Sequence, residues 1–151
     1  MIMHILLFFT CGLLGIFLGA QIAEAVLFVP YWKAMRADDF FELHKTYGKK
    51  IYQFFAPLTI AATIVPLTTS IYGLANVARL QFYWIVLGAS TLIFFMTYFL
   101  YFKKANRSFA DRSLSDEKLP RELIRWERWH WGRIIFQVIA FLTALTITIQ
   151  W

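Results

Sequence analysis

Two polar stripes in an otherwise apolar sequence carry the side chains that are able to do chemistry. The first stripe holds Gln21 and Glu24, which lie three residues apart and so share one face of a helix. The second recurs at spacings of four, three and four residues and consists of Trp126, His130, Arg133 and Gln137. A carboxylate, an imidazole and a guanidinium brought together in this way suit proton transfer and the stabilisation of an oxyanion.

A structural role explains the same charged residues. A charged side chain inside a membrane needs a partner, so Glu24 and Arg133 are expected to form an ion pair that fixes the register of two helices. His130, flanked by tryptophans, also fits a histidine held by a hydrogen bond at the membrane interface. The ion pair and a proton-transferring role for Glu24 are compatible with each other.

Further polar and aromatic side chains are expected at the same membrane face, because they follow or end apolar stretches that reach it. The sequence therefore predicts one site, whose catalytic group consists of Glu24, Tyr47, Trp126, His130 and Arg133. The predicted substrate-binding group consists of Gln21, His44, Tyr98, Tyr101, Asn106 and Gln137.

The sequence predicts no cofactor and no metal at this site, and two metal-containing alternatives stay open. Two histidines and a carboxylate form the ligand set of non-haem iron oxygenases, and His44, His130 and Glu24 offer these groups from three separate segments. A haem held between His44 and His130 is the second alternative. No glycine-rich phosphate loop or zinc-type cysteine spacing is present, and Cys11 is the only cysteine.

Four long uncharged stretches must position these residues. They span 5–23, 51–78, 80–102 and 134–151, and each is close to the roughly 20 residues that cross a bilayer. Hydrophobic residues make up 60% of the 151 residues and charged residues 16%. This composition excludes a soluble domain. It predicts an all-α polytopic membrane protein: one domain, 1–151, with four transmembrane helices in a bundle, at about 5–30, 51–76, 80–102 and 120–151.

The distribution of basic residues predicts the orientation in the membrane. Fourteen of the 15 Lys and Arg residues lie in the first and third connections, which should therefore be cytoplasmic, with both termini outside a cell (inner) membrane. Because these residues flank membrane spans, anionic lipid is the expected partner and nucleic acid is not. Asp39 and Glu42 predict a capping-box start for a short interfacial helix in the first connection, which runs into the second span.

Prolines and glycines inside the spans have structural interpretations. Pro57 and Pro66 favour kinks in the second span, where threonine hydroxyls are available to the freed carbonyls. Gly12, Gly15 and Gly19 lie on one face of the first span, and this face predicts either close packing inside the bundle or a homodimer.

The last part of the sequence resembles a known family. Asn106, a charged linker and then Trp126, His130 and Arg133, spaced Trp-x-x-x-His-x-x-Arg ahead of an apolar helix, resemble the anthrone-oxygenase-like family. This is a group of small four-helix membrane proteins, largely of unknown function, and the resemblance extends over the whole chain. It implies oxidation of anthrones to anthraquinones by molecular oxygen, without a bound organic cofactor.

On this resemblance, a hydrophobic small molecule enters an aromatic-walled pocket between the helices. His130 is expected to remove a proton, and Arg133 or Tyr47 to stabilise the oxyanion. Two alternatives stay open. One is a non-catalytic membrane scaffold or subunit, for which the glycine face and basic loops suffice. The other is a small proton-coupled transporter that uses Glu24 as its coupling carboxylate.

Overall fold

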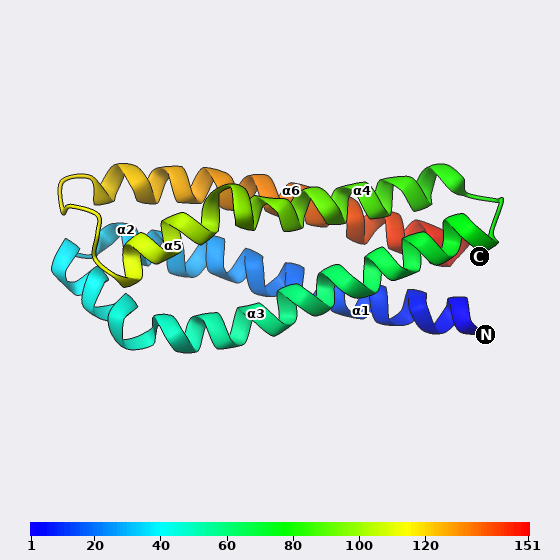
Figure 1. Ribbon diagram of the computed structural model, residues 1–151, viewed down its shortest axis with the longest axis horizontal. Coiled ribbons are helices and arrows are strands. Elements are labelled where there is room, and N and C mark those ends of the chain that lie inside the picture. Colours follow the sequence, from blue (N-terminus) through cyan, green and yellow to red (C-terminus); the bar gives the residue numbers. More distant parts are fainter.

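The apolar stretches and the charged segments beside them fold into four long helical rods in the computed structural model, which describes residues 1–151 (Figure 1). The first rod comprises α1 (Ile2–Ala23), a π-helical turn η1 (Glu24–Phe28) and α2 (Val29–Ala34). The second is α3 (Ala37–Asn76). The third comprises α4 (Gln81–Thr97), a π-helical turn η2 (Tyr98–Phe102) and α5 (Lys103–Ala110), and the fourth is α6 (Leu119–Gln150).

All four rods are long and apolar enough to cross a membrane, which confirms the predicted all-α, four-helix membrane protein. Both termini and the α3–α4 connection lie at one end of the bundle (Figure 1). The α2–α3 and α5–α6 connections lie at the other end (Figure 1), and the segments 33–50 and 103–133 that contain them hold all the Lys and Arg residues except Arg79. We call this second end the basic end.

The first and third rods continue beyond the predicted spans, to Ala34 and Ala110 instead of 30 and 102. Each contains a π-helical turn where it approaches the basic end. The first of these turns ends two residues before Pro30, which has no N–H to donate to the carbonyl four residues earlier. A π-helical turn adds one residue to a helix and changes which side chains share a face.

The second rod starts differently from the prediction. The expected interfacial helix is the first part of α3, which begins at Ala37 with Asp38 and Asp39 in its first turn. No side chain caps this end, so the predicted capping box at Asp39 and Glu42 is wrong. Two carboxylates in the first turn stabilise the positive end of the helix dipole without a capping hydrogen bond.

Pro57 and Pro66 both lie inside α3, which continues through them without a break. Three threonine hydroxyls of this helix donate to the carbonyls of Phe55, Thr59 and Val65. None of these is the carbonyl four residues before either proline. The expectation that threonines satisfy the carbonyls freed by the prolines is therefore wrong, because each hydroxyl reaches back along its own turn.

The glycine face of α1 packs less closely than the first alternative requires. A Cβ atom at Gly15 would lie 3.3 Å from the ring of Phe141, but one at Gly12 or Gly19 would meet nothing within 4 Å. Close packing inside the bundle is thus wrong for two of the three glycines. The close approach occurs instead at Gly73 of α3, where any side chain would overlap the buried indole of Trp84.

Candidate functional site

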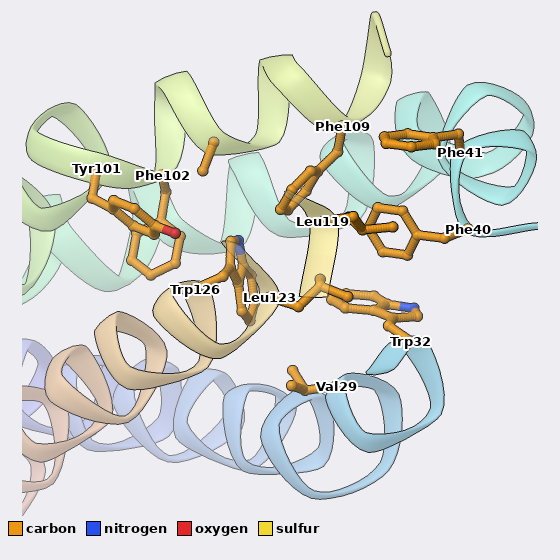
Figure 2. Close-up of a cluster of buried hydrophobic side chains, with 11 residues drawn as sticks. Val29, Trp32, Phe40, Phe41, Tyr101, Phe102, Phe109, Leu119, Leu123 and Trp126 are labelled. Carbon is orange, nitrogen blue, oxygen red and sulfur yellow. The ribbon is translucent and has the colours of Figure 1, made fainter. Parts of the chain in front are cut away.

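An aromatic cluster at the basic end holds the four rods in register around the site. Its side chains come from α2, α3, η2, α5 and α6 and turn toward one another (Figure 2). We call it the basic-end cluster, and it consists of Val29, Trp32, Phe40, Phe41, Tyr101, Phe102, Ala105, Phe109, Leu119, Leu123 and Trp126. Trp32 and Trp126 pack edge to face, with their ring centroids 5.7 Å apart.

A cavity of about 800 Å³ lies beside this cluster and shares Trp32, Phe109 and Trp126 with it. This volume lies within the range of about 300–1,000 Å³ that is typical of small-molecule sites. Twelve of its 23 lining residues are hydrophobic. The apolar wall comes from two neighbouring rods and includes Tyr52, Phe55, Ile60, Phe95 and Phe99.

The polar wall of the cavity is built around an ion pair between the first and fourth rods. Arg133 Nη2 lies 3.3 Å from Glu24 Oε2, and the two side chains are 13% and 7% exposed. The guanidinium also lies over the ring of Phe102, 4.2 Å from its centroid. Glu24 is the first residue of the π-helical turn η1, and Arg133 comes from α6, so the pair joins rods far apart in sequence.

His130 lies behind this pair and does not line the cavity. Its Nε2 is 2.9 Å from the carbonyl of Gln21 and 3.8 Å from Glu24 Oε2. Because a carbonyl only accepts hydrogen bonds, Nε2 carries the hydrogen and Nδ1 carries the lone pair. The ring stacks on Trp126, with centroids 4.8 Å apart. His130 therefore positions the backbone that carries Gln21 and Glu24.

Several buried polar atoms near the ion pair have no hydrogen-bond partner. They are both amide atoms of Gln21, His130 Nδ1, Arg133 Nε and Gln137 Oε1. Buried polar groups in folded proteins nearly always have a partner, and leaving one unpaired is costly. Because Gln21 and Arg133 both line the cavity, a donor and an acceptor on a ligand would find partners there.

His44 contributes a second basic nitrogen from α3. Its Nδ1 is 3.0 Å from the carbonyl of Phe40 and therefore carries the hydrogen, which leaves Nε2 as an acceptor. The imidazole packs against Phe40, Trp32 and Phe109 and lines the cavity. The cavity thus presents a carboxylate, a guanidinium and a neutral-form imidazole from three different rods.

Seven of the eleven predicted site residues line the cavity: Gln21, Glu24, His44, Tyr98, Asn106, Trp126 and Arg133. Tyr98 is the first residue of the π-helical turn η2, and the Oδ1 of Asn106 accepts a hydrogen bond from Trp126 Nε1 at 2.9 Å. Both tyrosine and asparagine therefore face the cavity from the third rod.

Four predicted site residues lie outside the cavity: Tyr47, Tyr101, His130 and Gln137. Tyr47 is 52% exposed on the outer surface of α3. The hydroxyl of Tyr101 donates to Glu122 at 2.7 Å, and its ring stacks on Trp129. Gln137 is buried deeper in the bundle, where its amide nitrogen donates to the carbonyl of Leu14 at 3.4 Å.

The sequence prediction missed the residues of α3 and α5 that complete the lining. The basic ones are Lys45, Lys49, Lys103 and Arg107, and the aromatic ones include Tyr52 and Phe55. A signal for them was present, because positions 45, 49, 52, 56 and 59 follow helical periodicity and all line the cavity. Basic residues beside a membrane span are equally typical of contacts with lipid headgroups, so their charge alone does not assign them to a cavity.

The two metal alternatives do not fit the arrangement of the side chains. No group of three or more His, Cys, Asp or Glu side chains is placed to hold a metal ion, so Glu24, His44 and His130 do not form one ligand set. A haem between two histidines does not fit either, because His130 Nε2 bonds to the Gln21 carbonyl outside the cavity.

Comparisons with protein-family models, with curated proteins and with solved structures find no match. A function for this chain must therefore be argued from the cavity and its chemistry.

Proposed function

We propose that the protein takes a flat hydrophobic aromatic molecule from the bilayer into the cavity and oxidises it with molecular oxygen, without a bound organic cofactor. The observation that carries the proposal is the Glu24–Arg133 pair beside the unpartnered amide of Gln21, at the polar wall of an aromatic-lined cavity. The resemblance to anthrone oxygenases supplies the reaction, and the cavity supplies groups that suit it.

The proposed reaction begins with removal of a proton from the CH₂ group beside the aromatic rings of an anthrone. The carboxylate of Glu24 accepts this proton, and the electron pair left on carbon is shared with the ketone oxygen, whose charge Arg133 stabilises. Molecular oxygen takes up the electron pair and forms a C–O bond at that carbon, and the resulting peroxide takes back the proton from Glu24. Loss of the second C–H proton then forms the C=O bond and breaks the O–O bond, and the departing hydroxide leaves with that proton as water. One substrate and one O₂ thus yield one quinone and one water.

This assignment changes the expected roles of three residues. His130 is a positioning residue, since it holds the carbonyl of Gln21 and lies 3.8 Å from Glu24 without reaching the cavity. Tyr47 has no part in stabilising the oxyanion, because it faces away from the cavity. Glu24 takes over as the base, and Arg133 keeps its expected role.

The orientation in the membrane is also part of the proposal. The protein lies in the cell membrane with its basic end facing the cytoplasm, because the segments that meet at this end carry 14 of the 15 Lys and Arg residues. The cavity then opens at the cytoplasmic half of the bilayer, where its aromatic wall meets the lipid.

Oxidation of 1,8-dihydroxyanthrone by detergent-purified protein tests the proposal. Absorbance measures quinone formation and an oxygen electrode measures oxygen uptake, for the wild type, Glu24→Gln and Glu117→Gln. Glu117 is an exposed carboxylate that does not line the cavity, and it serves as the matched control. We expect Glu24→Gln to lower kcat by roughly 100-fold or more, the contribution typical of a general base, and Glu117→Gln to have no effect.

Two results would overturn parts of this proposal. If the wild-type rate equals the rate without protein, the protein does not catalyse the oxidation of hydroxylated anthrones, and the proposed activity is wrong. A normal kcat in Glu24→Gln, with the same yield of folded protein, would remove Glu24 as the base and leave the imidazole of His44 as the next candidate.

A non-catalytic subunit is the second candidate, and the open glycine face favours it. Gly12 and Gly19 are exposed on α1 with room for a neighbouring helix. Cross-linking of Gly12→Leu and Gly19→Leu variants tests whether this face joins two copies, as a homodimer requires. Proton-coupled transport has less support, because Glu24 is paired with Arg133 instead of standing alone.

A further inference from the structure

The rim of the cavity carries positive charge that the proposed oxidation does not use. Lys45 and Lys49 lie four residues apart on α3, and Lys103 and Arg107 lie four residues apart on α5. All four side chains are exposed and line the cavity. The two pairs belong to different rods, so cationic groups approach the cavity from two sides.

Acidic residues leave most of this charge unbalanced. Lys45 lies 3.8 Å from Glu42, and Arg107 lies 3.7 Å from Asp111, but Lys49 and Lys103 form no ion pair. The single carboxylate among the lining residues is Glu24, and Arg133 already pairs with it. The cavity therefore has a net positive lining of four charges, five cations against one anion.

The apolar wall continues directly from these cations along the same rods. On α3, Lys49 is followed by Tyr52 and Phe55, and on the third rod Lys103 is preceded by Phe99 and Phe95. The lining thus has a cationic part at the basic end and an aromatic part further toward the centre of the bundle. A molecule with one anionic group and a long apolar body would match both parts.

We infer that the cavity selects anionic amphiphiles, in which a carboxylate or phosphate binds Lys49 and Lys103 while the apolar body lies against Phe55, Phe95 and Phe99. This inference rests on the proposed binding of a hydrophobic molecule and narrows its chemical class. The anionic group can belong to a free acid or to a lipid headgroup, and both share the same chemistry.

Equilibrium binding of a fluorescent polyene fatty acid, cis-parinaric acid, and of its methyl ester tests the inference in neutral detergent. The variant Lys49→Gln/Lys103→Gln removes the two unpaired cations. The matched control, Lys50→Gln/Lys104→Gln, removes the same charge one residue further along each helix, from residues that do not line the cavity. Circular dichroism and gel filtration confirm that each variant is folded.

We expect the wild type to bind the acid more tightly than the ester. Lys49→Gln/Lys103→Gln should weaken binding of the acid by roughly five- to tenfold, as two exposed charge contacts imply, and leave binding of the ester unchanged. The control variant should match the wild type for both probes. Added salt should weaken binding of the acid to the wild type only slightly less than the double substitution does.

The outcomes separate this inference from the proposed function. Equal affinity for acid and ester, or equal loss in both double variants, would overturn anion selection and leave the cavity as a hydrophobic site. Binding of neither probe would overturn the cavity as a ligand site as well. Displacement of the acid by lysophosphatidylglycerol, but not by lysophosphatidylcholine, would support the inference with a lipid as the source. Displacement by neither would support it with a free acid.

Discussion

Replacing Glu24 by glutamine should cost far more stability than replacing Glu127, although the Glu127 pair is shorter. Lys33 and Glu127 are 2.8 Å apart with side chains 36% and 25% exposed, whereas Arg133 and Glu24 are 3.3 Å apart and 13% and 7% exposed. At an effective dielectric constant of about 20, charges 3.3 Å apart attract by about 5 kcal/mol, and at about 80 charges 2.8 Å apart attract by about 1.5 kcal/mol.

Desolvation and side-chain ordering change these two figures in different ways. Removing one member of a buried pair strands the other charge, which costs about 3–5 kcal/mol. Breaking an exposed pair costs about 0–1 kcal/mol. We therefore expect Glu24→Gln to lower the free energy of unfolding by about 3 kcal/mol or more, and Glu127→Gln by less than about 1 kcal/mol.

Unfolding by sodium dodecyl sulfate in mixed micelles, followed by tryptophan fluorescence, measures both changes. The double variant Glu24→Gln/Arg133→Met should recover most of the loss, because it leaves no stranded charge. Equal losses in Glu24→Gln and Glu127→Gln would refute the reasoning that burial decides the strength of the pair. Additive losses in the double variant would refute the direct interaction between Glu24 and Arg133.

Three further predictions concern packing, hydrogen bonding and pH. Gly73→Ala should destabilise the protein by about 1–3 kcal/mol, because the added Cβ would overlap Trp84. Gly19→Ala should change stability by less than about 1 kcal/mol, because its Cβ would meet nothing within 4 Å. The same unfolding titration compares the two variants. Trp126→Phe should cost about 1 kcal/mol through loss of the hydrogen bond to Asn106, and Trp126→Ala about 3–5 kcal/mol, measured in the same way. Hydrogen bonds from Ser113 and the charge of Arg107 lower the pKa of Asp111 from its ordinary 3.8, so its contribution to stability is present at neutral pH and is lost as the pH falls below 3.8. The unfolding free energies of wild type and Asp111→Asn should therefore differ near neutral pH and converge under acid conditions.

The number and order of the transmembrane helices could be predicted because hydropathy alone determines them, but their ends could not. The third apolar stretch ends just before Lys103. Hydropathy indicates which residues lie in the membrane, but it does not indicate where the helix itself ends. The helix continues to Ala110 because Ala105 and Phe109 pack into the basic-end cluster. The hydropathy pattern predicts neither such tertiary contacts nor the two π-helical turns.

The pairing of Glu24 with Arg133 could also be predicted, since the two residues lie at similar depth on neighbouring rods. Which residues of each stripe reach the cavity could not. Trp126, His130, Arg133 and Gln137 share one face of α6, yet only the first and third line the cavity. The rotation of α6 about its own axis relative to its neighbours decides this, and the spacing of residues in the sequence does not specify that rotation.

The central claim is that a flat aromatic molecule binds inside this cavity, and photo-cross-linking with benzophenone tests it most directly. Benzophenone is a diaryl ketone that reacts with nearby C–H bonds under ultraviolet light, and mass spectrometry locates the attachment. We expect labels on cavity residues such as Phe55, Ile60 and Tyr98, which excess 1,8-dihydroxyanthrone should prevent. Labels confined to outward-facing residues such as Phe82 and Ile149, unaffected by the competitor, would contradict it.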